Sequence, residues 1–182
     1  MRYLREYGLA DLSLRQLAER LGTSHRLLIY HFQSKEGLLT AITEEIEREQ
    51  HVWARAISEQ GLSPMEQLHS MWDRTADPAL DQPLRLFVEM YGHTVQGRSH
   101  TAELLGTLVD TWLGTLAQLC RRMGMTTAEA RIHARLILAT VRGLMLDLLV
   151  TGDEKGTRAA WQFFIAQYDD LPGAHESRRQ KR

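Results

Sequence analysis

The 182-residue chain has little of what several classes of protein need. Its single cysteine, Cys120, cannot form an internal disulfide or supply a cysteine-rich zinc site, which favours a reducing compartment. No apolar run approaches the ~20 residues of a membrane-spanning helix, because Arg142 and Asp147 interrupt the best candidate, 136–150. Residues 1–7 lack the apolar stretch of a signal peptide. We therefore expect a cytoplasmic protein without a membrane partner.

The chain also has few prolines, and neither sign of charge dominates. There are only 4 prolines, and the alternating β-branched residues that are typical of strands are nearly absent, which predicts an all-α fold. With 43% hydrophobic residues, the chain has enough apolar material to exclude disorder over its whole length. Lys and Arg number 22 against 23 Asp and Glu, yet residues 1–39 hold six basic and four acidic side chains. This mild excess favours an anionic partner for the N-terminal end.

Local signals at helix ends divide the chain into helices. Capping boxes are expected where Ser or Thr precedes Glu or Gln by three residues, at Ser13 with Gln16, Ser63 with Glu66 and Thr126 with Glu129. Apolar periodicity stops at glycines 22, 61, 97, 124 and 152, as expected of C-terminal helix caps. The predicted helices are 2–7, 13–21, 24–32, 35–60, 64–76, 83–96, 100–123, 126–151 and 157–169.

The segment 13–39 predicts a helix-turn-helix. Leu14, Leu17, Ala18 and Leu21 form one apolar stripe, Gly22 ends that helix, and a second helix begins after a turn of about three residues. In this motif the second helix lies in the major groove of DNA. Such a helix pair also occurs as an inert structural corner, which is the alternative that the pattern leaves open.

The outer side of the second helix indicates a DNA-binding surface. Leu28 and Phe32 are four residues apart and should face the core, which leaves Ile29 and Tyr30 outside unless DNA covers them. On the same side Arg26 can reach a guanine edge or a phosphate, His25 can donate to a base edge, and Ile29 can pack on a thymine methyl group. Phosphate contacts are expected from Ser13, Tyr30, His31 and Lys35.

This segment resembles the DNA-binding region of the TetR family of bacterial transcriptional regulators, over about the first 45 residues. The resemblance is carried by Leu17, Ala18, Leu21, Gly22, Tyr30, His31, Phe32, Ser34, Lys35, Glu36 and Leu38. It places phosphate contacts at Ser13, Tyr30, His31 and Lys35, and base contacts at Arg15, His25, Arg26 and Ile29. Ile29 departs from the family, in which tyrosine is common at this place.

The resemblance also implies an architecture and a function. It implies a three-helix DNA-binding domain at 1–45 and a helical effector-binding and dimerisation domain at 46–172. From the basic composition of its end, we expect a disordered tail at 173–182. The implied function is that of a ligand-responsive repressor. It would bind a near-palindromic double-stranded DNA operator as a homodimer, and a small-molecule effector of unknown identity would release it.

Two residue sets are predicted for the C-terminal helices. The middle helices contain a mostly apolar set that suits an effector pocket and equally suits core packing: Trp72, Phe87, Met90, Tyr91, His93, Leu108, Val109 and Trp112. The resemblance implies that the last two long helices form the dimer seam, although the aromatic face of the final helix also suits core packing. The seam set is Ile132, Leu136, Gly143, Leu146, Trp161, Phe164, Ile165 and Tyr168.

Other functions are weighed against this one. Glu66 and His69 have the Glu-x-x-His spacing of di-iron proteins, but the sequence holds no second such pair and no HExxH motif. No nucleophile motif surrounds Cys120. We therefore assign no catalytic residue, metal ligand or cofactor, and a helical metal or cofactor enzyme is the competing hypothesis. A family member that no longer binds DNA is a further alternative, because the first predicted helix is short.

Overall fold

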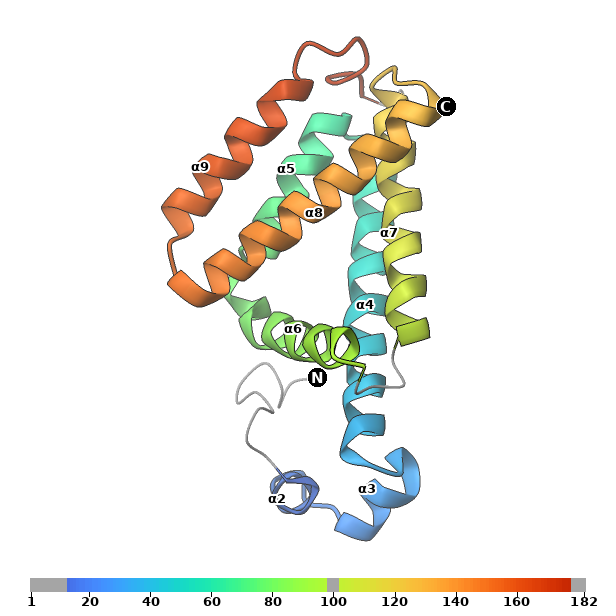
Figure 1. Cartoon of the computed structure of the whole chain (residues 1–182), viewed down its shortest axis with the longest axis vertical. Coiled ribbons are helices and arrows are strands. Elements are labelled where there is room, and N and C mark those ends of the chain that lie inside the picture. The colour runs from blue at the N-terminus through green and yellow to red at the C-terminus, as the bar shows by residue number, and fades with distance from the viewer. Residues whose placement is uncertain (1–12, 98–101, 178–182) are drawn as a thin grey trace. The chain divides into compact units, whose positions relative to one another are not determined.

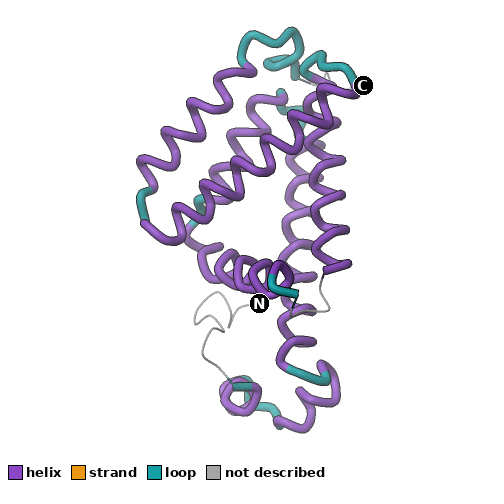
Figure 2. The backbone as a smooth tube through the Cα atoms, viewed as in Figure 1, coloured by secondary structure: helices purple, strands orange, loops and turns teal. Residues whose placement is uncertain are grey.

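A computed structural model describes residues 13–97 and 102–177, without the side chains of Lys35, Glu36, His93 and residues 102–104. All regular elements in these ranges are helices (Figure 2), which confirms the predicted all-α fold. The predicted helix 2–7 lies outside the described residues. The α-helices are α2 Leu14–Arg20, α3 His25–Phe32, α4 Lys35–Glu59, α5 Pro64–Thr75, α6 Asp81–Val95, α7 Ala102–Arg122, α8 Thr127–Thr151 and α9 Glu154–Ile165 (Figure 1). Short 3-10 helices occupy Pro78–Leu80 and Ala166–Tyr168.

The predicted helix caps are confirmed. In all three capping boxes the first hydroxyl accepts a hydrogen bond from the backbone N–H three residues later, at 3.3 Å. The Gln or Glu of each box accepts in return from the N–H of the first residue, at 2.7 to 3.0 Å. The five glycines predicted to end helices all have a positive φ, between 65° and 98°. Local hydrogen bonding and glycine geometry thus set most helix ends.

Two helices begin earlier than predicted. Helix α6 begins at Asp81 and takes Pro83 into its first turn, where a missing N–H costs no helical hydrogen bond. Helix α9 begins at Glu154, because the Asp153 carboxylate accepts from the Gly156 N–H at 2.8 Å and caps the helix. The α-helix ends at Ile165, and the predicted continuation to residue 169 is a 3-10 turn.

The chain forms two compact units. The first comprises Met1–Glu49 and Ala79–Leu105, and the second comprises Gln50–Pro78 and Gly106–Arg182. The units therefore divide the chain differently from the predicted segments 1–45 and 46–172, because α6 groups with the N-terminal helices. Helix α4 begins in the first unit and ends in the second. None of the described helices combines the length and apolarity needed to cross a membrane.

The core of the first unit joins the helix-turn-helix to α4 and α6. Ala18 is almost fully buried, and its small side chain lets α2 and α3 approach closely. Leu86 and Met90 of α6 belong to the same cluster. Leu21, which was predicted to join the buried stripe of α2, is instead 50% exposed, because it forms the helix C-cap beside Gly22.

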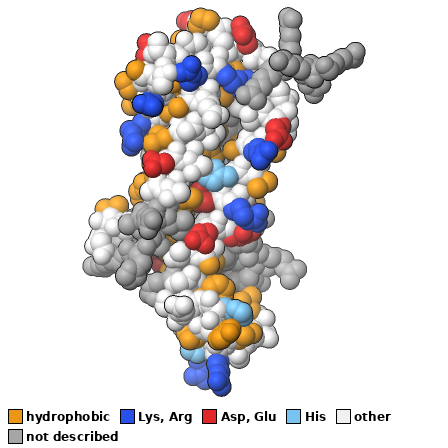
Figure 3. All heavy atoms as spheres, turned by 90° about the vertical axis from the view of Figure 1, so that its right-hand side faces the viewer, with side chains coloured by type: hydrophobic (Ala, Val, Ile, Leu, Met, Phe, Trp, Pro, Cys, Tyr) orange, Lys and Arg blue, Asp and Glu red, His pale blue; other side chains and the backbone are white. Residues whose placement is uncertain are grey.

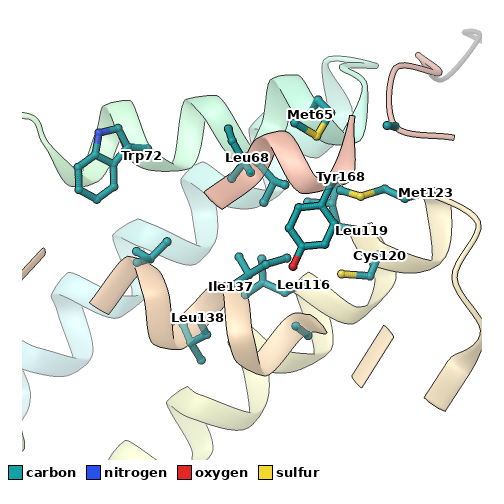
Figure 4. Close-up of a cluster of buried hydrophobic side chains, with 14 of the residues drawn as sticks. Met65, Leu68, Trp72, Leu116, Leu119, Cys120, Met123, Ile137, Leu138 and Tyr168 are labelled. Carbon is teal, nitrogen blue, oxygen red and sulfur yellow. The ribbon is translucent and has the colours of Figure 1, made fainter. Parts of the chain in front are cut away.

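The core of the second unit is larger and combines α5, α7, α8 and α9 (Figure 4). This core also contains a residue of the segment 173–177, which the sequence analysis assigned to a disordered tail. Ala174 is fully buried, and its carbonyl oxygen accepts from the Met65 N–H at 3.1 Å. Residues 173–177 are thus ordered, and the predicted start of the tail at 173 is wrong; 178–182 lie outside the described residues.

Candidate nucleic-acid interface

The turn between α2 and α3 is fixed by local hydrogen bonds. Gly22 adopts a φ of 65°, and the Thr23 N–H donates to the Ala18 carbonyl oxygen at 2.9 Å. The Ser24 hydroxyl then accepts from the Leu27 N–H at 3.1 Å and starts α3. A glycine at the turn and a serine cap therefore hold the second helix at a defined angle to the first.

Helix α3 divides into the two faces that the sequence predicts. Leu28 is buried in the first unit's core, and Phe32 packs against it half-buried. On the opposite side Ile29 is 37% and Tyr30 80% exposed, and Arg26 is exposed as well. Figure 3 shows hydrophobic, histidine and basic side chains sharing the surface of the part that α2 and α3 form. Apolar contacts, hydrogen-bond donors and positive charge on one face are what a DNA groove requires.

The predicted DNA-contacting residues lie at the surface wherever their side chains are described. These exposed residues are Ser13, Arg15, His25, Arg26, Ile29, Tyr30 and His31. The side chain of Lys35, the eighth member of the set, lies outside the description. The Tyr30 and His31 rings meet edge to face, with centroids 5.3 Å apart, at the C-terminal end of α3. This contact restricts the directions in which the Tyr30 hydroxyl can point.

Two of these residues already have local partners. The Ser13 amide and hydroxyl both donate to Gln16 Oε1, at 3.0 and 2.9 Å. A phosphate can take these donors only by replacing the Gln16 side chain. Arg15 lies 3.8 Å from a Glu19 carboxylate oxygen, and both side chains are well exposed, so the ion pair is weak.

The turn between α3 and α4 contains features that the sequence reasoning did not identify. Gln33 has a φ of 62°, and the Ser34 N–H donates to the Phe32 carbonyl oxygen at 2.7 Å across it. The Ser34 hydroxyl accepts from the Gly37 N–H at 3.0 Å. A Cβ atom on Gly37 would lie 2.1 Å from the Phe32 carbonyl oxygen. The Ser-x-x-Gly spacing was the available signal for this tight connection between α3 and α4.

The predicted effector set divides between the two units. In the first, the Phe87 and Tyr91 rings lie 5.6 Å apart and Met90 is in the core, whereas the His93 side chain lies outside the description. In the second, Trp72 is buried and stacks on Trp161 at 5.7 Å. Also in the second unit, Leu108 is buried, Val109 is half-buried, and Trp112 lies 5.0 Å from the His51 ring. A single effector pocket formed by this set stays a prediction.

The predicted dimer set also separates into two groups. Ile132, Leu136, Gly143 and Leu146 of α8 are exposed. Trp161, Ile165 and Tyr168 instead pack in the core of their own chain, and Phe164 packs against that core half-buried. The assignment of Trp161, Ile165 and Tyr168 to a dimer seam is therefore corrected, because these three side chains pack in the core. A seam that includes Phe164 and the four α8 residues stays a prediction. The exposed aromatic side chain of α9 is Phe163, at 80%, which the sequence reasoning missed.

Metal binding and nucleophilic catalysis are the other chemistries that the sequence raised. The described residues contain no group of three or more His, Cys, Asp or Glu side chains that could hold a metal ion. Cys120 is fully buried, and this burial raises the pKa of its thiol to about 11. The thiol therefore stays protonated at neutral pH, in which form it is a poor nucleophile.

Comparison with known proteins gives matches over both the N-terminal region and most of the chain. Residues 1–42 match the model of bacterial regulatory proteins of the tetR family. The HTH-type transcriptional regulator BetI of Stenotrophomonas maltophilia (strain R551-3) is 27% identical over 171 residues, which are 89% of this chain and 85% of that protein. The class G tetracycline repressor protein of Vibrio anguillarum is 46% identical over 48 residues, 26% of this chain and 23% of that protein.

A crystal structure of BioQ with its double-stranded DNA operator has a similar fold. It is 22% identical to this chain, with a TM-score of 0.59, and the match covers 92% of this chain and 91% of that one. Residues 1–42, with the capped helix pair and the exposed face of α3, therefore match the DNA-binding region of the tetR family of bacterial regulatory proteins. Together with the long match to BetI, this supports a tetR-family regulator.

Proposed function

We propose that this regulator represses transcription as a homodimer on a near-palindromic operator, and that a small-molecule effector releases it. The observation that carries the proposal is the outer face of α3, where Arg26, Ile29 and Tyr30 are exposed together while Leu28 anchors the opposite face. Apolar and aromatic side chains on the surface of so small a unit are accounted for when a DNA groove covers them.

Individual roles follow from side-chain chemistry. His25, Arg26 and Ile29 would read base edges, and Tyr30, His31 and Lys35 would contact phosphates. Arg15 would exchange Glu19 for a base edge. Ser13 would exchange Gln16 for a phosphate oxygen. Both exchanges replace weak surface contacts by contacts with DNA, so their net contribution to affinity should be small.

A second copy of the chain would cover the apolar face of α8. Its exposed residues follow one another at intervals of three and four, which places them on one side of the helix. They are Ile132, Leu136, Ala139, Gly143, Leu146 and Val150. Ala139 and Gly143 stand in the middle, where small side chains permit a close helix crossing, and Phe163 of α9 adds an aromatic anchor. Two-fold pairing through this face would present two α3 helices to a near-palindrome.

Effector release would use helix α4. This helix starts two residues after α3, in the first unit, and ends in the second unit. A ligand that favours one arrangement of the second unit can therefore bias α3 through a continuous helix. The repressor name of the Vibrio anguillarum relative supports repression as the outcome. Native mass spectrometry of the purified protein would detect an effector that co-purifies.

DNA binding is tested with the segment upstream of the protein's own coding sequence, by fluorescence anisotropy over a range of salt concentrations. Tyr30→Ala and Lys35→Ala should each weaken binding roughly 5- to 100-fold, and Lys35→Ala should also lower the salt slope by about 1. Arg135→Ala, which removes an exposed arginine from α8, is the control and should leave binding unchanged. Unchanged binding by both α3-side variants would contradict the proposal.

A further inference from the structure

A cavity of about 370 Å³ opens in the second unit where the α7–α8 turn meets the end of α9. Its lining contains none of the residues predicted for the effector pocket; it includes Met125, Glu129, His133, Leu136, Phe164 and Tyr168. Leu136 also belongs to the proposed α8 contact, so the cavity lies beside that contact and shares this one residue with it. We infer that this cavity is a second binding site, for a small organic cation with an apolar body. The inference does not depend on DNA binding.

The size and the walls of the cavity suit a small organic molecule. Its volume lies within the range of about 300–1,000 Å³ that is usual for ligand pockets. Met125, Leu136 and Phe164 supply apolar wall, and the Phe164 and Tyr168 rings lie 5.8 Å apart at an interplanar angle of 77°. Aromatic rings attract a cation placed over their faces, in addition to the apolar contact that they offer.

The charge of the lining selects the ligand. Glu129 is the acidic residue of the wall, and no Lys or Arg is among the residues that line the cavity. The Thr126 N–H and hydroxyl both donate to Glu129 Oε2, at 2.9 and 2.7 Å, which holds the pKa of this carboxyl below its usual value. The carboxylate is therefore ionised at neutral pH, and its other oxygen can bind an ammonium group. An anionic ligand would meet repulsion.

The lining also contains the polar side chains of His133, Gln167 and Tyr168, of which His133 and Tyr168 contact each other. His133 Nδ1 lies 3.1 Å from the Tyr168 hydroxyl, and the two rings meet edge to face at 82°. Burial raises the pKa of Tyr168 to about 12, so its phenol stays neutral. A neutral phenol bonded to Nδ1 orients the imidazole without adding negative charge to the wall.

Ligand binding in this cavity can be followed by the intrinsic fluorescence of a nearby tryptophan. Phe164 lines the cavity and lies 5.9 Å from Trp161, which stacks on Trp72 at 5.7 Å. A ligand against Phe164 should therefore change the fluorescence of Trp161. Replacing the half-buried Trp53 and Trp112 by Phe simplifies the signal to the stacked pair.

The test compares three probes that share one apolar body: phenethylamine, 2-phenylethanol and phenylacetate. Each is titrated into the full chain without DNA, by calorimetry and by tryptophan fluorescence. Phenethylamine should bind about fivefold more tightly than the alcohol, as expected for a partly exposed ion pair with an aromatic contribution, and phenylacetate should bind most weakly. Equal binding of the three, or binding of none, would overturn the inference.

Two matched variants distinguish the effect of the Glu129 charge from the effect of a lost helix cap. Glu129→Gln removes the negative charge but keeps a residue that completes a capping box, so α8 should retain its start. Glu66→Gln makes the same change in the capping box of α5, away from the cavity lining. The preference for the amine should disappear in Glu129→Gln and persist in Glu66→Gln. A preference that survives in Glu129→Gln would also refute the site, whatever the outcome of the DNA experiments.

Discussion

Helices α3 and α8 each leave several apolar side chains uncovered, and the composition of the two exposed faces differs. On α3, Ile29 and Tyr30 stand among His25, Arg26 and His31. On α8, the exposed stripe from Ile132 to Val150 consists of aliphatic and small residues. Basic and hydrogen-bonding groups between apolar ones suit a charged, hydrated groove, whereas an uninterrupted aliphatic stripe suits a dry contact with protein. The comparison therefore supports the proposal that α3 contacts DNA and that α8 contacts a second copy.

The largest expected effect comes from a charge in the α8 stripe. Leu146→Glu would place a carboxylate from each chain among the apolar side chains of the proposed two-fold contact. The dissociation constant of the dimer should rise by about three orders of magnitude, since an unpaired charge in an interface costs roughly 3–5 kcal/mol. Sedimentation velocity measures this change.

The control for that variant lies on the other face. Tyr30→Glu carries the same new charge on α3 and should leave the sedimentation coefficient of the dimer unchanged while it abolishes DNA binding. A monomeric Tyr30→Glu protein, or a dimeric Leu146→Glu protein, would reverse the assignment of the two faces.

The stability of the second unit should depend on the close packing of its C-terminal segment. A Cβ on Gly173 would lie 1.9 Å from the Arg122 carbonyl oxygen, beside the buried Ala174 that seals the second core. Gly173→Ala should therefore lower the free energy of unfolding of the second unit by about 2–4 kcal/mol. Gly106→Ala is the control: its Cβ meets open space in α7, and alanine favours a helix by roughly 1 kcal/mol. Denaturant unfolding, followed by the fluorescence of the Trp72–Trp161 pair, measures the free energy of unfolding. An unchanged value for Gly173→Ala would contradict the packing argument.

Base reading is a smaller effect that sharpens the interpretation of the α3 face. Arg26→Ala should cost about 1–3 kcal/mol of binding and relax the preference at one base pair of each half-site. A panel of operators with single substitutions, read by competition, measures both quantities. A uniform loss over all sequences would instead make Arg26 a phosphate contact.

The sequence predicted those features that depend on local chemistry. The serine and threonine caps, the glycines with positive φ and the two faces of α3 each depend on a few neighbouring residues, and each is found. Whether Trp161 and Ile165 face their own core or a second copy was not predictable from the sequence. Periodicity places residues on one face of a helix but does not determine which surface packs against that face. The grouping of α6 with the N-terminal helices and the burial of Ala174 depend on contacts between distant segments. The cavity beside Glu129 likewise needs the end of α9 to meet the α7–α8 turn.

The smallest expected effect concerns the strained turn between α3 and α4. Gln33 holds a φ of 62° and a ψ of −42°, outside the left-handed helical region that other residues tolerate best. Gln33→Gly should remove this strain at the cost of a more flexible unfolded chain, with a net gain of about 0.5–1 kcal/mol for the first unit. Gln33→Ala keeps a Cβ and is the matched control, expected to be neutral. Hydrogen exchange of the α3 amides measures the difference, and equal protection in the two variants would mean that the turn stores no strain. DNA affinity should rise slightly in Gln33→Gly if a better-held α3 is the binding surface, whereas the dimer formed through α8 should not respond.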